Sequence, residues 1–390
     1  MSFHMYVPTR ILFGEGQLND LHNQQMPGKK ALIVISNGKS AHTNGSLDRT
    51  KDELKQAGIQ TVVFDRIMAN PLKSTVMEGA ACARENGCDF IVALGGGSVM
   101  DASKAIAAMA TNDGDLWDYV SGGTGKGQPL CHEPLPIIAI TTTAGTGSEV
   151  DQYGVISNED TNEKIGFGGQ DSLFPQIAIV DPELMQSVPP KFTAYQGFDA
   201  LFHSVECYIA APANLMSDMY ALTAIENIGS YLARAVQNGS DKEAREHVAF
   251  ANTLSGVVMT ISACTSEHSM EHAMSAYHQE LPHGAGLIMI SKAYFTHFIE
   301  KHACDERFVR MAQALGKKDA SEPMDFIAAL VKLQEDCGVA DLKMSNYGIQ
   351  PDEFMTLAQN ARATMGGLFL CDRVPLSDEE CAAIYEKSYR

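Results

Sequence analysis

The sequence predicts two domains: an α/β domain built on an open sheet over residues 1–185, and an all-helical domain over residues 186–390. Three observations support this division. A chain of 390 residues is too long for most single hydrophobic cores. Short apolar runs alternate with helix-like stretches up to about residue 185, whereas afterwards apolar residues recur at spacings of three and four. Pro189 and Pro190 mark the change and indicate the junction.

Five continuous apolar runs predict the strands of the sheet. Runs rich in β-branched residues and without polar alternation are typical of parallel strands buried on both faces. The segments between them, such as residues 47–58, carry apolar residues at helical spacing and end on glycine. Strand and helix therefore alternate, which predicts an open α/β sheet. The runs are ALIVI (31–35), TVVF (61–64), FIVAL (90–94), IIAIT (137–141) and IAIV (177–180).

The second half carries amphipathic helical patterns and almost no strand-like run. Apolar residues at intervals of three and four place one face of each helix toward a core. The clearest patterns cover residues 220–236, 250–264, 324–338 and 379–389.

Charge and cysteine usage exclude several classes of function. The 29 Lys and Arg residues face 48 Asp and Glu residues, for a net charge of -19, so polyanions such as nucleic acids or anionic membranes would be repelled. The nine cysteines are odd in number and form no CxxC pair, which favours reduced thiols over a disulfide framework. With no signal-peptide pattern and no apolar stretch long enough for a membrane helix, we expect a cytoplasmic protein.

Gly95, Gly96 and Gly97 follow the FIVAL run and precede a helical pattern. Such a cluster lets the backbone approach a ligand, and the helix that opens at Ser98 would direct free amides and a positive dipole toward an anion. A pyrophosphate is the expected occupant, although a tight turn without a ligand is the alternative. A second loop after the IIAIT run, with hydroxyls at Thr142, Thr143, Thr146 and Ser148, reaches the same edge of the sheet. The two loops together predict a dinucleotide site; for the second, a turn that caps a helix at Ser148 is the alternative.

The helical half contains two pairs of residues with metal-ligand spacing. Asp199 and His203 lie four residues apart and would share one helix face, as would His268 and His272. His278 and His283 follow. One carboxylate with several imidazoles suits Fe²⁺, Zn²⁺ or a similar ion. If a coordination position stays open, that ion can polarise a carbonyl. A lone histidine such as His278 is more often an ordinary interior or surface residue.

These motifs together resemble the iron-containing alcohol dehydrogenase family, over nearly the full chain. The resemblance rests on ordered segments, which are ILFGEG (11–16), Asn70-Pro71, GGGSVMDASK (95–104), TTAGTGSEV (142–150), Lys164, IVDPEL (179–184), GFDALFHSVECY (197–208), HSMEHAMSAY (268–277) and LPHGAGL (281–287). It implies a dehydroquinate synthase-like fold: an amino-terminal dinucleotide-binding domain and a helical metal-binding domain, with the active site in the cleft between them.

The resemblance also implies roles for individual residues. The metal ligands would be Asp199, His203, His268 and His283, whereas His272 would lie beside the nicotinamide and the substrate. The interval from His268 to His283 is one residue longer than the family pattern, so His272 or His278 could instead take a ligand position. The cofactor would be held by Ser36, Asn37, Lys39, Asn70, Gly96, Gly97, Ser98, Thr142, Thr143 and Lys164, with Asp101 supporting the glycine loop.

Two departures from the family pattern concern specificity. Asp151 stands where the family has threonine, in a segment expected to border the substrate. Members that prefer NAD carry an aspartate after the strand at residues 31–35, but here Ser36, Asn37, Gly38 and Lys39 follow it. Without that carboxylate a 2′-phosphate is not repelled, and Lys39 would attract it, so we expect NADP to be favoured over NAD.

The expected function is reversible hydride transfer between NAD(P)H and a small aldehyde or ketone bound to Fe²⁺ or, alternatively, Zn²⁺. His272 would relay a proton to the product alkoxide. A metal-dependent polyol or sugar-phosphate dehydrogenase or cyclase of the same fold is the alternative enzyme, but Glu206, Glu267 and Glu271 disfavour an anionic substrate. A nucleotide- and metal-binding module without catalysis is the alternative from another class. A homodimer is the expected assembly.

Overall fold

The computed structural model describes residues 2–390 and divides into two compact units. The first comprises residues 7–143 and 147–187 and contains every strand. The second comprises residues 2–6, 144–146 and 188–390 and is helical. The main division falls after Ser187, two residues beyond the boundary expected at 185, because the chain enters a long helix only at Pro190.

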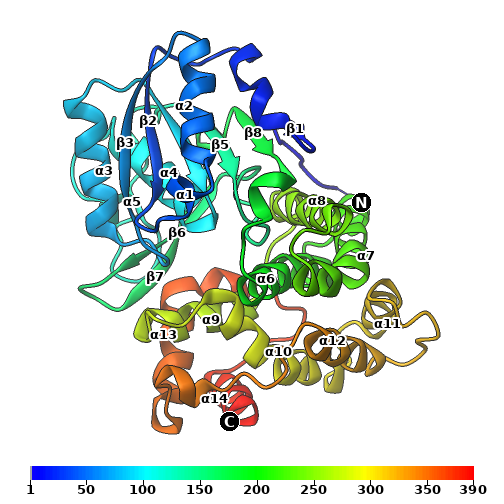
Figure 1. Cartoon of the computed structure of the whole chain (residues 1–390). Coiled ribbons are helices and arrows are strands. Elements are labelled where there is room, and N and C mark those ends of the chain that lie inside the picture. The colour runs from blue at the N-terminus through cyan, green and yellow to red at the C-terminus, as the bar shows by residue number, and fades with distance from the viewer. Residues whose placement is uncertain (1) are drawn as a thin grey trace. The chain divides into compact units, whose positions relative to one another are not determined.

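A six-stranded parallel sheet in the order β1-β8-β5-β4-β2-β3 forms the centre of the first unit (Figure 1). All five predicted strands are confirmed. The middle of each is buried except in edge strand β3, where it is half-buried. The strands are β1 (Arg10–Phe13), β2 (Lys30–Ser36), β3 (Gln60–Ile67), β4 (Phe90–Gly95), β5 (Ile137–Thr141) and β8 (Ile177–Val180).

Three further strands lack an apolar run of the kind that predicts a buried strand. Edge strand β1 has two exposed residues and pairs only with β8. Strands β6 (Tyr153–Asn158) and β7 (Glu163–Gly168) form a separate antiparallel hairpin. Polar residues and glycines interrupt both strands of the hairpin, so periodicity alone does not reveal them.

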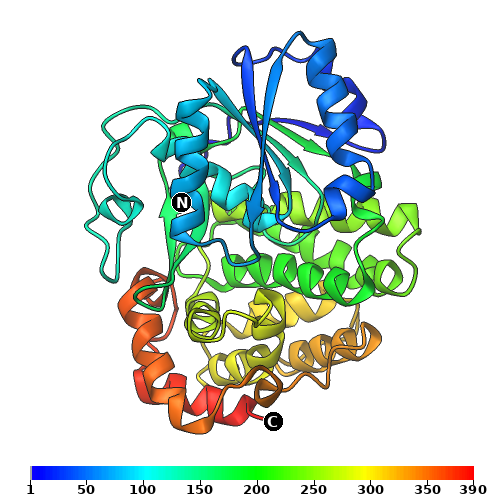
Figure 2. The same cartoon turned by 60° about the vertical axis from the view of Figure 1, so that its left-hand side comes forward.

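Helices cover the two faces of the sheet through two apolar clusters. On one face, α3 (Lys73–Glu85) and α4 (Gly97–Met109) pack on side chains such as Ile91 and Ala139. On the other, α2 (Ser46–Gln56) and the 3₁₀ helix η1 (Gln17–Asn23) pack on the alternate residues of the same strands. Figure 2 shows this sheet between its flanking helices. Short helices α1 (Ser40–Thr43) and α5 (Leu116–Tyr119) complete the unit.

The strand order places a topological switch point between β2 and β4. The chain moves outward from β2 to β3, then returns to β4 and continues through β5 on the opposite side. In open α/β sheets, ligands bind beyond the carboxyl ends of the strands at such a point. The segments that leave these two strands are residues 36–39 and 95–98, which contain predicted cofactor residues.

The second unit is a bundle in which α6 packs against α7, α8 and α10, while α9 packs against α10 and α13. Its helices are α6 (Pro190–Ile209), α7 (Leu215–Gln237), α8 (Lys242–Met259), α9 (Ser266–Tyr277), α10 (His283–Glu300), α11 (Asp305–Ala314), α12 (Asp325–Asp336), α13 (Phe354–Phe369) and α14 (Asp378–Ser388). The predicted helical domain is confirmed, except that the pattern at 250–264 ends early, at Met259.

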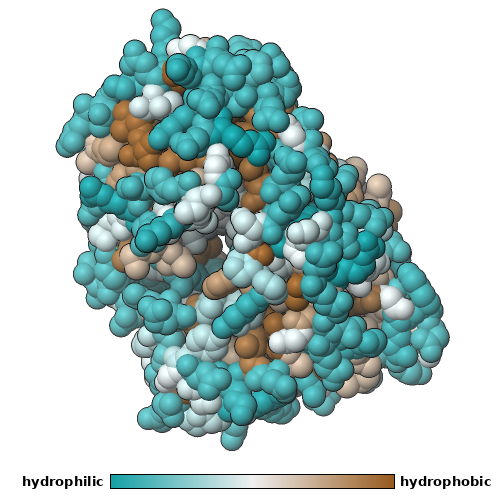
Figure 3. Space-filling model, viewed as in Figure 1, coloured by the Kyte–Doolittle hydropathy of each residue, from teal (hydrophilic) through white to brown (hydrophobic). Residues whose placement is uncertain are grey.

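The hydrophilic surface and the free cysteines match the expectations drawn from the charged-residue content and the cysteine spacing. The face drawn in Figure 3 is mostly hydrophilic, as the high content of acidic residues predicts. All nine cysteines are free thiols. Within residues 2–390, no helix has both the length and the apolar character that a membrane span requires.

Candidate active site

The glycine loop joins β4 directly to α4, as predicted. Gly96 is the residue that precedes the helix, and no side chain caps this helix terminus. Within residues 2–390, the Gly97 and Ser98 amides in the first turn have no hydrogen-bond acceptor. Free amides and the helix dipole make this turn suitable for a phosphate group.

The second loop lies against the first. Gly95 pairs with Thr141 in the sheet, and the Thr142 amide donates to the Gly95 carbonyl at 2.9 Å. A Cβ atom at Gly96 would lie 2.7 Å from Thr143 Oγ1, so a glycine is needed where the two loops meet. The turn that contains Ser148 does not open a helix, so the alternative of a helix capped by Ser148 is wrong.

A buried ionic network connects α4, which follows the first loop, to the residues at the end of the second loop. The Lys104 ammonium donates to Ser148 Oγ and Asp151 Oδ1, each at 2.7 Å, and to the Tyr153 carbonyl. Asp101 accepts from Ser148 Oγ at 2.8 Å and from the Val155 amide at 2.9 Å. Burial raises the pKa of Asp101 to about 6, although Lys104 opposes the shift. Asp101 and Asp151 thus link α4 to the segment that follows the second loop.

Four side chains from three helices meet in the second unit. Asp199 and His203 come from α6, His268 from α9, and His283 from the first position of α10. Asp199 Oδ1 lies 3.5 Å from His203 Nδ1, 3.5 Å from His268 Nε2 and 3.4 Å from His283 Nε2. Ligands about 2.1 Å from a tetrahedral ion would be about 3.4 Å from one another, which matches these separations.

The inward-facing atoms of this cluster fit a metal ion. Asp199 Oδ1, His203 Nδ1 and His268 Nε2 are all buried, and none has a hydrogen-bond partner among the described residues. A buried polar atom without a partner costs about 1–3 kcal/mol, so three such atoms that face one point indicate a bound cation. Asp199, His268 and His283 place ligand atoms within 4.8 Å of one another. One carboxylate and three imidazoles suit Fe²⁺ or Zn²⁺.

The electrostatics favour the deprotonated forms of Asp199 and His203, whereas the neighbouring Glu206 carboxylate raises the pKa of His268 well above its usual range despite burial. Burial opposes ionisation of Asp199, but the His203 and His283 imidazoles outweigh burial and hold the pKa of this carboxyl well below its usual range. Burial lowers the pKa of His203 to about 3, so that imidazole is neutral at physiological pH. A carboxylate and a neutral imidazole are the forms that bind metal ions.

Two buried glutamates are hydrogen-bonded to histidines of this cluster. Glu206 Oε1 is hydrogen-bonded to His268 Nδ1, and Glu271 Oε2 to His283 Nδ1. Both carboxylates are completely buried. A carboxylate behind an imidazole fixes the ring orientation and the tautomer, which leaves Nε2 free to bind a metal.

Comparison with known proteins covers both units. Residues 8–182 match the family model of iron-containing alcohol dehydrogenase, and residues 193–389 match the carboxyl-terminal model of the same family. The chain belongs to the iron-containing alcohol dehydrogenase family. The resemblance noted in the sequence is therefore confirmed, as is the dehydroquinate synthase-like fold class. This dehydrogenase transfers hydride reversibly between a nicotinamide cofactor and an alcohol or aldehyde.

Several relatives of the dehydrogenase match over its full length. It is 34% identical to 1,3-propanediol dehydrogenase from Klebsiella pneumoniae, with 100% of both chains covered. It is 30% identical to an NAD-dependent methanol dehydrogenase from Bacillus methanolicus, over 92% of this chain and 93% of that one. An archaeal halo-thermophilic alcohol dehydrogenase from a Red Sea brine pool superposes with a TM-score of 0.93 at 35% identity, over 100% of this chain and 99% of that one.

His272 and His278, the other two histidines of this region, differ in their distance from the Asp199 cluster. The His272 ring is buried, and its centroid lies 5.2 Å from that of His283 and 6.2 Å from that of His268. Its Nδ1 contacts the Met365 sulfur, at a kink in α13. His278 follows the end of α9 and bonds to Glu353 at 3.2 Å, outside the groups that could hold a metal ion among the described residues. His272 lies beside the Asp199 cluster and forms, with Glu271 and His283, a second group that could hold a metal ion, whereas His278 joins no such group among the described residues.

The other predicted cofactor residues occupy the carboxyl edge of the sheet and the hairpin. Ser36 ends β2, the Asn37 amide bonds to the Ile67 carbonyl at 2.8 Å, and Lys39 is exposed. Asn70 follows β3 with a positive φ of 55°, and Lys164 is buried on β7. Their roles toward the cofactor remain predictions.

Sequence reasoning placed Glu206 and Glu271 only as acidic neighbours of the ligands. Their spacing offers a partial signal. Glu206 lies three residues after His203 and seven after Asp199, on the same helix face, and Glu271 lies three after His268. Each glutamate contacts a histidine on a different helix, Glu206 with His268 and Glu271 with His283. Spacing along one helix therefore does not reveal these pairs.

Proposed function

We propose that this dehydrogenase interconverts small uncharged aldehydes and their primary alcohols with an Fe²⁺ ion held by Asp199, His203, His268 and His283. The observation that carries the proposal is the set of three buried, unpartnered ligand atoms that face one point. The names of the relatives, which include dehydrogenases of propanediol, methanol and butanol, support a small substrate.

We assign cofactor binding, orientation of the metal ligands and proton transfer to different residues of the chain. A divalent ion, when bound, polarises the carbonyl group and stabilises alkoxide charge, and the nicotinamide supplies the hydride. We assign the pyrophosphate to the Gly97 and Ser98 amides, supported by the hydroxyls of Thr142 and Thr143. Glu206 and Glu271 hold the ligand imidazoles in the tautomer that exposes Nε2. His272, beside the ligands, is assigned the proton transfer to or from the substrate oxygen.

The test is an assay of NADPH and NADH oxidation with a panel of C2 to C4 aldehydes. Protein stripped of metal should be inactive, and anaerobic addition of Fe²⁺ should restore turnover more strongly than Zn²⁺. Turnover by the stripped protein would contradict the metal-dependent mechanism. Activity confined to phosphorylated substrates would contradict the proposed substrate class.

We also propose that NADP(H) is favoured over NAD(H). The segment after β2 offers no carboxylate at residues 36–39, whereas Lys39 is exposed there and can attract a 2′-phosphate. Relatives named as NAD-dependent exist, so the preference is a property of this segment rather than of the family.

Replacement of Gly38 by Asp should reverse this preference. The backbone of Gly38 permits a side chain, because a Cβ there would meet only Ser36 Oγ, at an ordinary contact distance of 3.5 Å. A carboxylate at this place would repel a 2′-phosphate and could bond the ribose hydroxyls of NAD. We expect kcat/KM for NADPH to fall about 10-fold or more relative to NADH, equivalent to about 1.4 kcal/mol.

Gly38→Asn is the matched control, since it adds a side chain of similar size without charge. It should leave the ratio of the two cofactors near that of the unaltered enzyme. An equal change of the ratio in both variants would show that size rather than charge acts at this position.

A further inference from the structure

The helix that carries His268 begins in an unusual way. Thr265 precedes α9, at a position where a threonine hydroxyl normally accepts a hydrogen bond from the helix's own amides. Its side chain makes no such bond. Instead, Thr265 Oγ1 donates to Glu206 Oε2 at 2.9 Å, and the Thr265 amide donates to the same oxygen at 2.7 Å.

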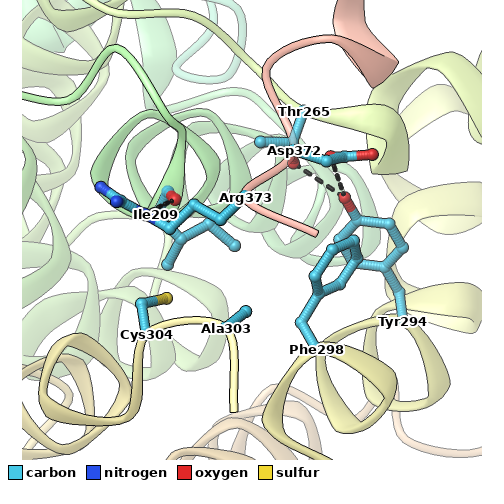
Figure 4. Close-up of a pocket in the computed structure, with 8 residues that line it drawn as sticks. All are labelled: Ile209, Thr265, Tyr294, Phe298, Ala303, Cys304, Asp372 and Arg373. Carbon is cyan, nitrogen blue, oxygen red and sulfur yellow. Dashed lines mark hydrogen bonds between the residues drawn. The ribbon is translucent and has the colours of Figure 1, made fainter. Parts of the chain in front are cut away.

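Thr265 is in turn hydrogen-bonded to Tyr294, which contacts Asp372. The Tyr294 hydroxyl, from α10, lies 2.9 Å from Thr265 Oγ1 and 3.2 Å from Asp372 Oδ1 (Figure 4). Asp372 Oδ1 also accepts from the Ser266 amide at 3.1 Å. A carboxylate from the loop after α13 thus caps the first turn of α9 in place of the local threonine.

The hydrogen bonds from Tyr294 through Thr265 to Glu206 have a single consistent direction. Thr265 uses its hydroxyl proton toward Glu206, so its oxygen is left as an acceptor for Tyr294. Burial raises the pKa of Tyr294 well above its usual range, with Asp372 adding to the shift, so the phenol keeps its proton. Tyr294 has a single hydroxyl proton, and its oxygen also lies 3.0 Å from Ser266 Oγ. When that proton goes to Thr265 Oγ1, Asp372 contacts the first turn of α9 through the Ser266 amide.

The hydrogen-bonded series of Thr265, Tyr294 and Asp372 ends at a small cavity. Asp372 and Tyr294 line a cavity of about 10 Å³, together with Ile209, Phe298 and Cys304 (Figure 4). Asp372 Oδ2 is buried and has no hydrogen-bond partner among the described residues. This volume accommodates about one water molecule, which could bond to that oxygen.

We propose that Thr265, Tyr294 and Asp372 form a positioning chain that orients Glu206 and, through it, the metal ligand His268. Thr265 does not cap its own helix and instead directs its hydroxyl at the carboxylate that is hydrogen-bonded to His268. One carboxylate oxygen of Glu206 is hydrogen-bonded to His268 and the other to Thr265, so rotation of the carboxylate would break both contacts. The inference rests on the proposed ligand set.

Two substitutions test the chain, with metal affinity rather than turnover as the readout. Thr265→Val and Tyr294→Phe each remove one hydroxyl and keep the side-chain shape. We expect each to weaken the affinity of the metal-stripped full-length protein for Zn²⁺ about 10-fold, at the lower end of the range for outer partners of metal ligands. The Co²⁺-substituted variants should show a shifted d–d absorption spectrum, because His268 is less well oriented.

Matched controls separate positioning from general destabilisation. Thr265→Ser keeps the hydroxyl and should retain the original affinity and spectrum. Tyr385→Phe also removes a buried phenol hydroxyl that contacts α9, but that hydroxyl bonds to the Met270 carbonyl and not to the chain. It should lower the melting temperature, if at all, without changing metal affinity.

The outcomes distinguish this inference from the proposed function. If the unaltered protein binds no divalent metal, the ligand set itself is wrong. If it binds Zn²⁺ and both Thr265→Val and Tyr294→Phe bind as tightly as Tyr385→Phe, the positioning chain is overturned. Should Thr265→Val fail to fold, Tyr294→Phe alone decides the question.

Discussion

His268→Ala should leave the dehydrogenase unable to retain its metal and without measurable turnover. The substitution removes one of the four proposed ligands, and it also leaves the Glu206 carboxylate buried without its imidazole partner. Loss of an outer partner alone costs about 10- to 100-fold in metal affinity, so loss of a ligand should cost more than about 100-fold. Metal content after gel filtration, measured by elemental analysis, and kcat/KM with added Fe²⁺ test this expectation.

His278→Ala is the control for this prediction. His278 lies ten residues further along the same segment but bonds to Glu353, outside the ligand cluster. It should keep full metal content and activity. A His268→Ala variant that is fully metallated and active would show that the ligand set is wrong, and loss of metal from His278→Ala would place that histidine in the set.

His272→Ala should spare the metal and lower kcat by about 10²- to 10⁴-fold, the usual contribution of general acid–base catalysis. The His272 ring lies 5.2 Å from the ring of His283, whereas nitrogens of the other three histidines lie 3.4–3.5 Å from Asp199 Oδ1. The loss should therefore appear in turnover at unchanged metal content. The measurement is single-turnover kinetics on the metal-loaded variant, with elemental analysis of the same sample.

Rescue by imidazole distinguishes proton transfer from packing. His272 is buried, so the alanine variant leaves a space of the size of the ring that was removed. Added imidazole should restore part of kcat in His272→Ala but not in His272→Phe, where a ring without nitrogen occupies the space. Metal loss from His272→Ala, or equal activity in all variants, would contradict the assigned role.

The strands of the sheet were predictable because four of the five runs are buried on central strands, and the fifth, on edge strand β3, is still rich in β-branched residues. Strand β1 and the hairpin β6–β7 were not, because exposed or glycine-rich strands lack that pattern. The same logic applies to the helices, whose amphipathic spacing predicted their positions, whereas the early end of α8 at Met259 did not follow from periodicity.

For the proposed metal site, the sequence alone predicted the candidate ligand types and the two helical pairs and, through ordered motifs, identified the family. Spacing within one helix determines which side chains share a face, so Asp199 with His203, and His268 with His272, could be recognised as pairs. The resemblance implied a place for His283, but only the tertiary structure decided that His278 pairs with Glu353, that Glu206 contacts His268 and that Glu271 contacts His283. These contacts join different helices, and the packing of helices depends on the whole core rather than on local spacing.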